Sequence, residues 1–303
     1  MQLFTKLIIS SLAIMFVSTG FAQSDDVDSV DESEQLKIVA LEALLSSPPD
    51  RALPLVANVL AGDNSDEVKS RALFVLSQID LPEAQNVLLD TARNGSGELK
   101  LQAIRMIGIS GNAEALAGLI EIYATGDNDV KESVLHAYMI ADDSNSVYEI
   151  AANATSDEEF ESAVNILGAM GANDELRKLR DRGGNSESLI HAYAIAGDAE
   201  SLQVLALDNS NPEQQIQAIQ GLGIVGGAEV NATLLEIYRA TDSDDVKEAA
   251  LHGMMVSGYD EGVLELFRAS QDAEEKRDLL RLLVMMDSDA AMAIIEETLS
   301  GNR

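Results

Sequence analysis

Cysteine and tryptophan are absent from this chain of 303 residues, and aromatic side chains make up only 4% of it. Without cysteine the protein can form no disulfide, no thiol-ligated metal site and no lipid attachment at a thiol. Basic residues are scarce as well, because 20 Lys and Arg stand against 52 Asp and Glu, which gives a net charge of −32. This charge argues against nucleic acid as a direct partner, since phosphates would meet a strongly negative surface. The hydrophobic content of 46% is nevertheless sufficient for a core.

Long apolar runs are also rare, and the clearest one lies at the start. Lys6 precedes an apolar run from Leu7 to Val17, and Gly20 and Ala22 place small residues where a signal peptidase requires them. We therefore expect a signal peptide over residues 1–22, cleaved after Ala22, and a periplasmic or secreted protein. Residues 23–33 are acidic and lack apolar periodicity, which predicts a disordered leader. No later stretch is a better candidate for a membrane span, so none is expected after cleavage.

The rest of the chain consists of internal copies of one unit. Residues 103–123 and 218–238 are identical at 12 of 21 positions without a gap, and 129–132 then matches 245–248. Aligning the openings of the copies gives nine units at spacings of 25 to 32 residues. They begin near Glu34, Ser65, Ser96, Asp127, Asp157, Ser186, Asn211, Ser243 and Ala273. Such repetition settles the architecture before any other feature is considered.

Each unit has the pattern of two amphipathic helices joined by a short break, with apolar residues at i, i+3, i+4 and i+7. Asn211 and Ser156 have the sequence context of helix N-caps. One helix pair cannot bury its apolar face alone, so the pairs must stack. We therefore predict an all-α fold over residues 34–303, a right-handed α-α superhelix of about nine helix pairs. Residues 182–185 predict a kink, and the prolines at 48, 49 and 54 predict an atypical first unit.

The units resemble HEAT repeats, in particular the short bacterial form known as phycobilisome-lyase HEAT-like repeats. The residues that carry the resemblance are Asp129-Val130-Lys131-Glu132, which open a first helix, and the stretch 108–116 around the turn. Lys131 stands where the family usually has Arg, and the fifth and sixth units match poorly. The resemblance implies a superhelix with the first helices outside and the second helices lining the concave side. It also implies a scaffold or adaptor, with a minority of lyases or isomerases that act on pigments.

An acidic ladder in the second helices is the main candidate for a partner-binding surface. It places one acid in the same position of six units, in an apolar–acid–apolar context. The ladder consists of Asp90, Glu121, Glu149, Glu236, Glu265 and Glu296. A solvated helix face and a negative stripe for a basic partner in the concave groove both explain it, and both interpretations stay open.

A basic cluster interrupts the ladder in the fifth unit, where Arg177, Lys178, Arg180 and Arg182 fall within six residues. We favour a surface of intramolecular salt bridges there. An anchoring patch for an acidic group, or a partner for the ladder, is the alternative.

The three histidines, His136, His191 and His252, occupy one position of the repeat that elsewhere holds mainly polar residues. Neighbouring units lie roughly 10 Å apart, too far for one metal bound at about 2 Å. We therefore favour an inherited surface position over a shared metal site. At another repeated position, Tyr123, Tyr238 and Phe267 are expected to pack in the core.

No motif for a phosphate loop, a zinc protease or a nucleophile elbow is present, and the sequence indicates no catalytic residue, cofactor or metal. Residues 127–129 and 242–245 fit helix caps better than cation loops. The leading hypothesis is a secreted or periplasmic scaffold that binds a protein partner, with a basic protein as the candidate. A lyase-like enzyme or maturation factor and a mainly structural repeat protein are the alternatives.

Overall fold

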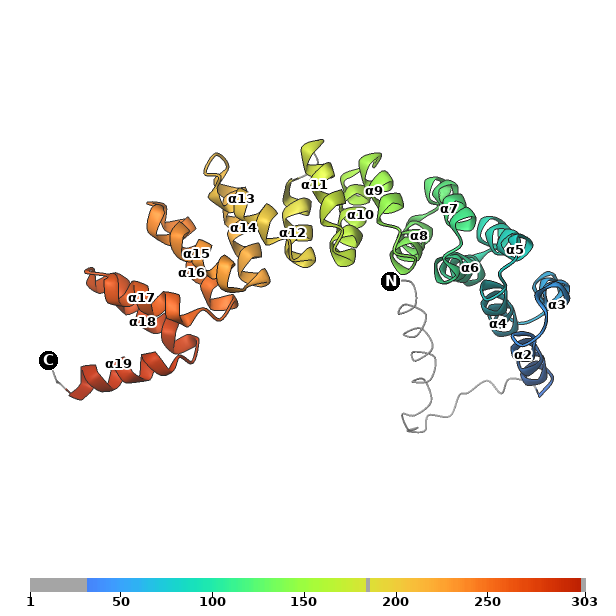
Figure 1. Ribbon diagram of the computed structural model, residues 1–303, viewed down its shortest axis with the longest axis horizontal. Helices are drawn as coiled ribbons and strands as arrows, with labels where there is room; N and C mark the ends of the chain where they lie inside the picture. The colour runs from blue at the N-terminus through green and yellow to red at the C-terminus, as the bar shows by residue number, and fades with distance from the viewer. Residues whose placement is uncertain (1–31, 184–185, 301–303) are drawn as a thin grey trace.

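The computed structural model describes residues 32–183 and 186–300, and within them the chain consists of helices and short connections, without strands. In this described part of the chain, eighteen helices follow one another along an open arc (Figure 1). They are α2 Glu32–Leu44, α3 Pro49–Ala61, α4 Asp66–Ser77, α5 Pro82–Asn94, α6 Gly97–Ser110, α7 Ala113–Thr125, α8 Asn128–Ile140, α9 Ser144–Ala152, α10 Asp157–Met170, α11 Asn173–Asp181, α12 Ser186–Ala196, α13 Ala199–Leu207, α14 Pro212–Val225, α15 Ala228–Ala240, α16 Asp244–Val256, α17 Asp260–Ala269, α18 Ala273–Met285 and α19 Asp289–Ser300. The fold is therefore an all-α solenoid, and the nine predicted helix pairs are confirmed.

The signal segment at 1–22 and the leader up to residue 31 lie outside the described residues. Helix α2 begins at Glu32, so the last two residues assigned to the leader are helical. Helix α3 continues through Pro54, which the sequence suggested would distort this unit. Of the expected kink at 182–185, residues 184 and 185 are not described, and the kink stays a prediction.

Helix starts follow the predicted capping chemistry. The Ser156 hydroxyl accepts a hydrogen bond from the Glu159 backbone N–H at 3.2 Å, and Asn211 accepts one from Gln214 at 3.3 Å. Asp127 accepts from the Val130 N–H at 3.0 Å, so this acid is a cap, as expected, and satisfies a free N–H of the first helical turn.

The helices form two layers. The first helix of each pair lies on the inner edge of the arc and the second helix on its outer edge, as Figure 1 shows from α4 to α17. Here the expectation taken from the HEAT resemblance is wrong, because the first helices and not the second line the concave side. The five members of the acidic ladder from Asp90 to Glu265 are consequently on the convex side and cannot form an acidic concave surface.

Small residues explain why the first helices form the inner layer. A Cβ placed on Gly108 in α6 would lie 2.7 Å from the Ala137 Cα in α8. The same close approach joins Gly168 to Ala192 and Gly223 to Gly253. Neighbouring first helices can thus approach backbone to backbone, and the layer with the closer spacing is the concave one.

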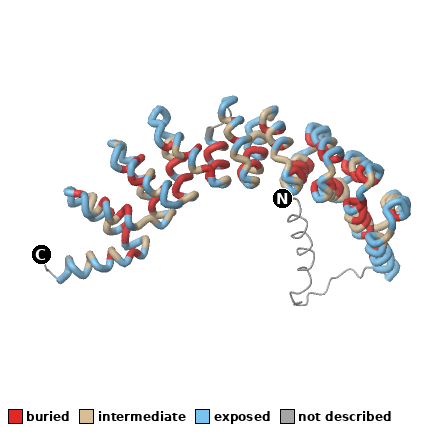
Figure 2. The backbone as a smooth tube through the Cα atoms, in the orientation of Figure 1, coloured by how far each residue is buried: buried red, intermediate tan, exposed pale blue. Residues whose placement is uncertain are grey.

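The core lies between the two layers (Figure 2). Tyr138 and Tyr193 are among its largest fully buried side chains, and their hydroxyls donate to the carbonyls of Leu116 and Leu176 at 3.1 and 3.3 Å. Tyr123 and Tyr238 are buried, and Phe267 packs partly buried against the same core, which confirms their predicted core position.

Candidate functional site

The concave side carries three rows of side chains that the first helices place one helical turn apart. Residues at i, i+4 and i+8 share one face of a helix and lie about 6 Å apart along its axis. The acidic row consists of Glu132, Glu161, Glu187 and Glu248. The middle row consists of His136, Asn165, His191, Gln220 and His252. The aliphatic row consists of Ile109, Ile140, Ile195, Ile224, Val256 and Met285.

The aliphatic row is the least expected of the three. Its side chains are 43% to 69% exposed although each is large and apolar. Isolated exposed aliphatic residues are ordinary, but a repeated row of them on one face of an array marks a surface that another molecule can cover. Unit five interrupts the row with Ala169.

Units four, six and eight repeat all three rows in the same order. Each has Glu, His and a β-branched aliphatic residue at intervals of four, in Glu132–Ile140, Glu187–Ile195 and Glu248–Val256. Units five and seven carry an amide in the middle position, at Asn165 and Gln220. All three histidines are therefore exposed on the concave side, which confirms the surface position expected for them.

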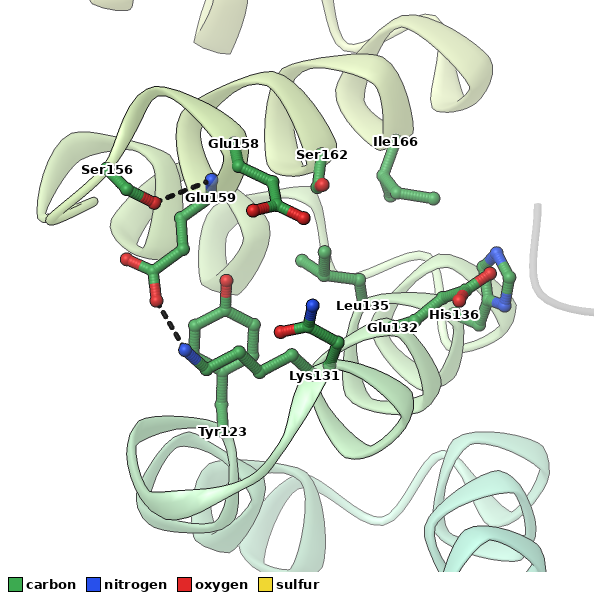
Figure 3. Close-up of a pocket in the computed structure, with 11 residues that line it drawn as sticks. Tyr123, Lys131, Glu132, Leu135, His136, Ser156, Glu158, Glu159, Ser162 and Ile166 are labelled. Carbon is green, nitrogen blue, oxygen red and sulfur yellow. Dashed lines mark hydrogen bonds and ion pairs between the residues drawn. The ribbon is translucent and has the colours of Figure 1, made fainter.

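A hollow of about 350 Å³ opens between α8 and α10. Glu132 and His136 lie side by side on α8, while Glu158 and Ser162 face them from α10 (Figure 3). Lys131 reaches across to Glu159, and the ring of Tyr123 lies beside its aliphatic stem (Figure 3). Both polar rows thus border the hollow through Glu132 and His136.

The ion pair that bridges this hollow includes the carboxyl of Glu159, which is strongly acidic. Glu159 accepts from the Lys131 Nζ at 2.5 Å and from the Thr155 hydroxyl and backbone N–H at 2.7 and 2.9 Å. These hydrogen bonds, led by that of Lys131, lower the pKa of Glu159 to about 2. Burial, together with the charge of Glu159, raises the pKa of Tyr123 to about 12. Glu159 is therefore charged over the physiological range, and its ion pair with Lys131 joins α8 to α10.

The same three residue types meet four units later, with a different hydrogen bond. The Tyr238 hydroxyl donates to a Glu275 oxygen at 2.7 Å, and Lys247 contributes to lowering the pKa of that carboxyl, below the hydrogen bonds from Ser270 and Tyr238. Tyr238, Lys247 and Glu275 occupy the repeat positions of Tyr123, Lys131 and Glu159. Since the duplication preserves a structural contact between units, we assign these residues to the framework of the site.

A second hollow, of about 530 Å³, spans α10, α12 and α14. Residues of all three rows line it, including Glu161, Asn165, His191, Gln220 and Ile224. The Asn165 Oδ1 is buried and accepts no hydrogen bond from the described residues. Because this hollow borders three consecutive first helices, it shows that the three rows share one continuous face.

Five members of the acidic ladder lie on second helices of the outer layer, Glu296 lies on the terminal helix α19, and all six are exposed. Two of them are paired within the chain: Glu121 accepts from Arg93 at 2.8 Å and Glu265 from Arg239 at 2.5 Å. Both pairs join second helices of adjacent units. Exposed pairs of this kind contribute about 0–1 kcal/mol, so they connect neighbouring units only weakly. Whether the ladder binds a partner stays a prediction.

Most charges of the basic cluster are paired locally. The Arg177 guanidinium donates to both oxygens of Asp198, at 2.7 and 3.0 Å, and the Asp198 side chain is only 2% exposed. Burial would raise the pKa of Asp198, but hydrogen bonds from Arg177 and Ser201 outweigh it and hold the pKa below its usual range. Arg177 therefore joins α11 to the N-terminus of α13.

The other three residues of the cluster have partners close in the chain or in space. Lys178 lies 3.6 Å from a Glu175 oxygen, Arg180 donates to Asp181 at 3.0 Å and Arg182 to the Tyr148 hydroxyl at 3.1 Å. This arrangement agrees with the favoured interpretation of local salt bridges. An additional role as an anchoring patch stays a prediction.

Sequence reasoning identified the histidine position but missed the rows beside it. The spacing Glu-x-x-x-His-x-x-x-aliphatic is visible in 132–140, 187–195 and 248–256. The pattern did not indicate an exposed row, because an aliphatic residue inside an amphipathic helix is ordinarily assigned to the core.

The comparisons with known proteins agree with the helix-pair architecture. Residues 53–139 match a family model described as HEAT repeats. No curated protein sequence is similar enough to this chain to count as a match. The HEAT match begins within α3, covers units two and three, and ends within α8, where the first Glu–His–Ile group lies.

Two solved structures are similar over most of their length. Human deoxyhypusine hydroxylase in complex with glycerol has 15% identity, with 89% of this chain and 93% of that chain covered, at a TM-score of 0.33. The complex of CpcE and CpcF of phycocyanin lyase from Nostoc sp. PCC7120 has 16% identity, with 93% and 98% covered, also at 0.33. At these values neither likeness bears on function.

Across residues 32–183 and 186–300, no three His, Asp or Glu side chains are grouped so that they could hold one metal ion. No helix in the same described part of the chain combines the length and hydrophobicity needed to cross a membrane.

Proposed function

We propose that this protein is an interaction scaffold that binds a protein partner along the concave face of its first helices. The aliphatic row is the observation that supports this role. A partner that covers the row removes apolar side chains from water in several units at once, at roughly 25 cal/mol per Å². The histidine, amide and acidic rows beside it supply polar contacts that orient the partner.

We propose that the protein binds its partner and does not catalyse a reaction. We also propose that all units of the array are of the HEAT type. An array of stacked units offers a long surface on which many weak contacts add up, and this is the property a scaffold needs. We assign partner binding to the concave rows and not to the acidic ladder, because the second helices that carry most of the ladder lie on the opposite side of the arc.

Export to the periplasm or the exterior is the second part of the proposal, and it rests on the apolar segment 7–17 and the small residues before position 23. Mass spectrometry of the protein isolated from its native compartment should show an N-terminus at Gln23. A chain that begins at Met1 in the exported fraction would contradict this.

A comparison of two triple variants tests the binding surface. We expect the concave variant Ile140→Ser, Ile195→Ser, Ile224→Ser to lose most of the partners that the unaltered protein retains after cross-linking in its native compartment. Its melting temperature should change little, because all three side chains are about half exposed or more.

The matched control is the convex variant Glu121→Gln, Glu236→Gln, Glu265→Gln, which should retain its partners. If the convex variant loses its partners and the concave variant keeps them, the acidic ladder and not the concave face is the binding surface.

A further inference from the structure

The concave face has an acidic central part with basic ends. In unit three the positions equivalent to the acidic and middle rows hold Leu101 and Arg105, and in unit nine they hold Arg277 and Arg281. Between them, four of five units carry an exposed Glu in the acidic row, and unit seven carries Ile216. Arg105 and Arg281 therefore delimit a segment from unit four to unit eight. Four steps between neighbouring helices of roughly 10 Å make this segment about 40 Å long.

The middle row can hydrogen-bond to a peptide backbone. Imidazole and amide groups both donate and accept, and no described residue hydrogen-bonds to the side chains of His136, His191, Gln220 or His252. Asn165 in the same row lines the hollow that spans α10, α12 and α14. A peptide backbone placed over this row would therefore meet both donors and acceptors.

The curvature favours an extended occupant. A helix is straight and would contact only part of an arc, whereas an extended chain can follow it (Figure 1). In the polyproline II conformation three residues advance about 9 Å, close to the step between neighbouring units, and every backbone N–H and C=O remains free. Every third side chain then meets the next unit, and about 13 residues span the segment.

We propose that units four to eight bind an extended basic polypeptide segment of about 13 residues, which places aliphatic side chains on the aliphatic row and Lys or Arg side chains on the acidic row. This inference rests on the proposed function and names its partner. Charge complementarity supports it, since the acidic row is exposed on a protein with a net charge of −32. The backbone of the segment lies over the middle row.

A synthetic probe tests this directly on the full mature protein. A fluorescent 15-residue peptide of five Leu-Lys-Ser repeats should bind with an affinity that falls as salt rises, because exposed charges are screened over about 10 Å at 0.1 M. Peptides of five Leu-Glu-Ser or five Ser-Lys-Ser repeats should bind at least tenfold more weakly, since each lacks one of the two contacts. Fluorescence polarisation, extended to millimolar protein, measures all three.

Two variants with the same change of charge separate a specific site from general attraction. The acidic-row variant Glu132→Gln, Glu161→Gln, Glu248→Gln should weaken probe binding about tenfold. The convex variant Glu121→Gln, Glu236→Gln, Glu265→Gln should change it less than twofold. An equal loss in both variants would overturn the inference, because it would show only attraction to a negative protein.

The remaining outcomes distinguish this inference from the proposed function. If Ile140→Ser, Ile195→Ser, Ile224→Ser abolishes partner binding but the acidic-row variant does not, the concave scaffold stands and the basic segment is wrong. Tighter binding of a Leu, Lys and Ser peptide with helical spacing would overturn the extended conformation. If neither the concave isoleucine variant nor the acidic-row variant affects binding of any partner or probe, both proposals fail.

Discussion

At the scale of single residues, the shape of this protein depends on a few positions without a side chain. Gly108, Gly168 and Gly223 lie near the ends of three first helices, and each faces a small residue of the next first helix. Units three, five and seven carry the glycine, and units four, six and eight carry the small residue that receives it. The helices of each such pair approach closely, and the larger gap between α8 and α10 contains the first hollow.

Replacement of Gly108 by alanine tests this contact. The new Cβ would lie 2.7 Å from both the Cα and the carbonyl oxygen of Ala137, which are backbone atoms and can move only with their helix. We expect Gly108→Ala to lower the free energy of unfolding by about 1–3 kcal/mol, measured by urea denaturation.

Gly118→Ala is the matched control, because its Cβ would meet only the ends of the Leu89 side chain. There, the helix propensity that alanine gains over glycine, about 1 kcal/mol, offsets the displacement of Leu89. The net change should stay below about 1 kcal/mol. Equal destabilisation by both substitutions would contradict backbone contact as the cause.

At the scale of helices, the two members of each pair have different tasks. The first helices approach one another through small residues and present the three rows to the concave side. The second helices carry exposed ion pairs such as Arg93 with Glu121, and Tyr123 and Tyr238 extend from them toward the first helices of the following units. The curvature follows from this difference, since the layer with the wider spacing must be the outer one.

At the scale of the whole molecule, the array has no single core that every unit shares. The core follows the arc as a continuous layer, and each pair packs mainly against its neighbours (Figure 2). Stability in such an array is approximately a sum over units and interfaces. The Tyr238–Glu275 hydrogen bond is one contact that reaches beyond the adjacent unit, from α15 to α18.

Deletion of residues 273–303 should therefore leave a folded protein. The helical signal in circular dichroism should fall in proportion to the 13 and 12 helical residues of α18 and α19. The melting temperature should fall, because the deletion exposes Leu266 and removes the partner of Tyr238. Complete loss of helicity would instead show that the units fold only as one cooperative body.

The sequence alone determined the number of units, their helix-pair content and their caps, because each is set by contacts within about thirty residues. Periodicity predicted the helices, and Ser156 and Asn211 act as caps through backbone groups three residues away. The exposure of the three histidines could also be inferred, since the polar residues at the equivalent positions of other units indicate a surface.

The tertiary structure decided which layer is concave, because curvature depends on the spacing between neighbouring helices. Gly108 and Ala137 define that spacing only when α6 and α8 lie side by side. The pairing of Arg177 with the buried Asp198 likewise joins residues from different units. The three rows exist for the same reason: stacking places side chains from five helices on one face, although residues 132, 161, 187 and 248 are far apart along the chain.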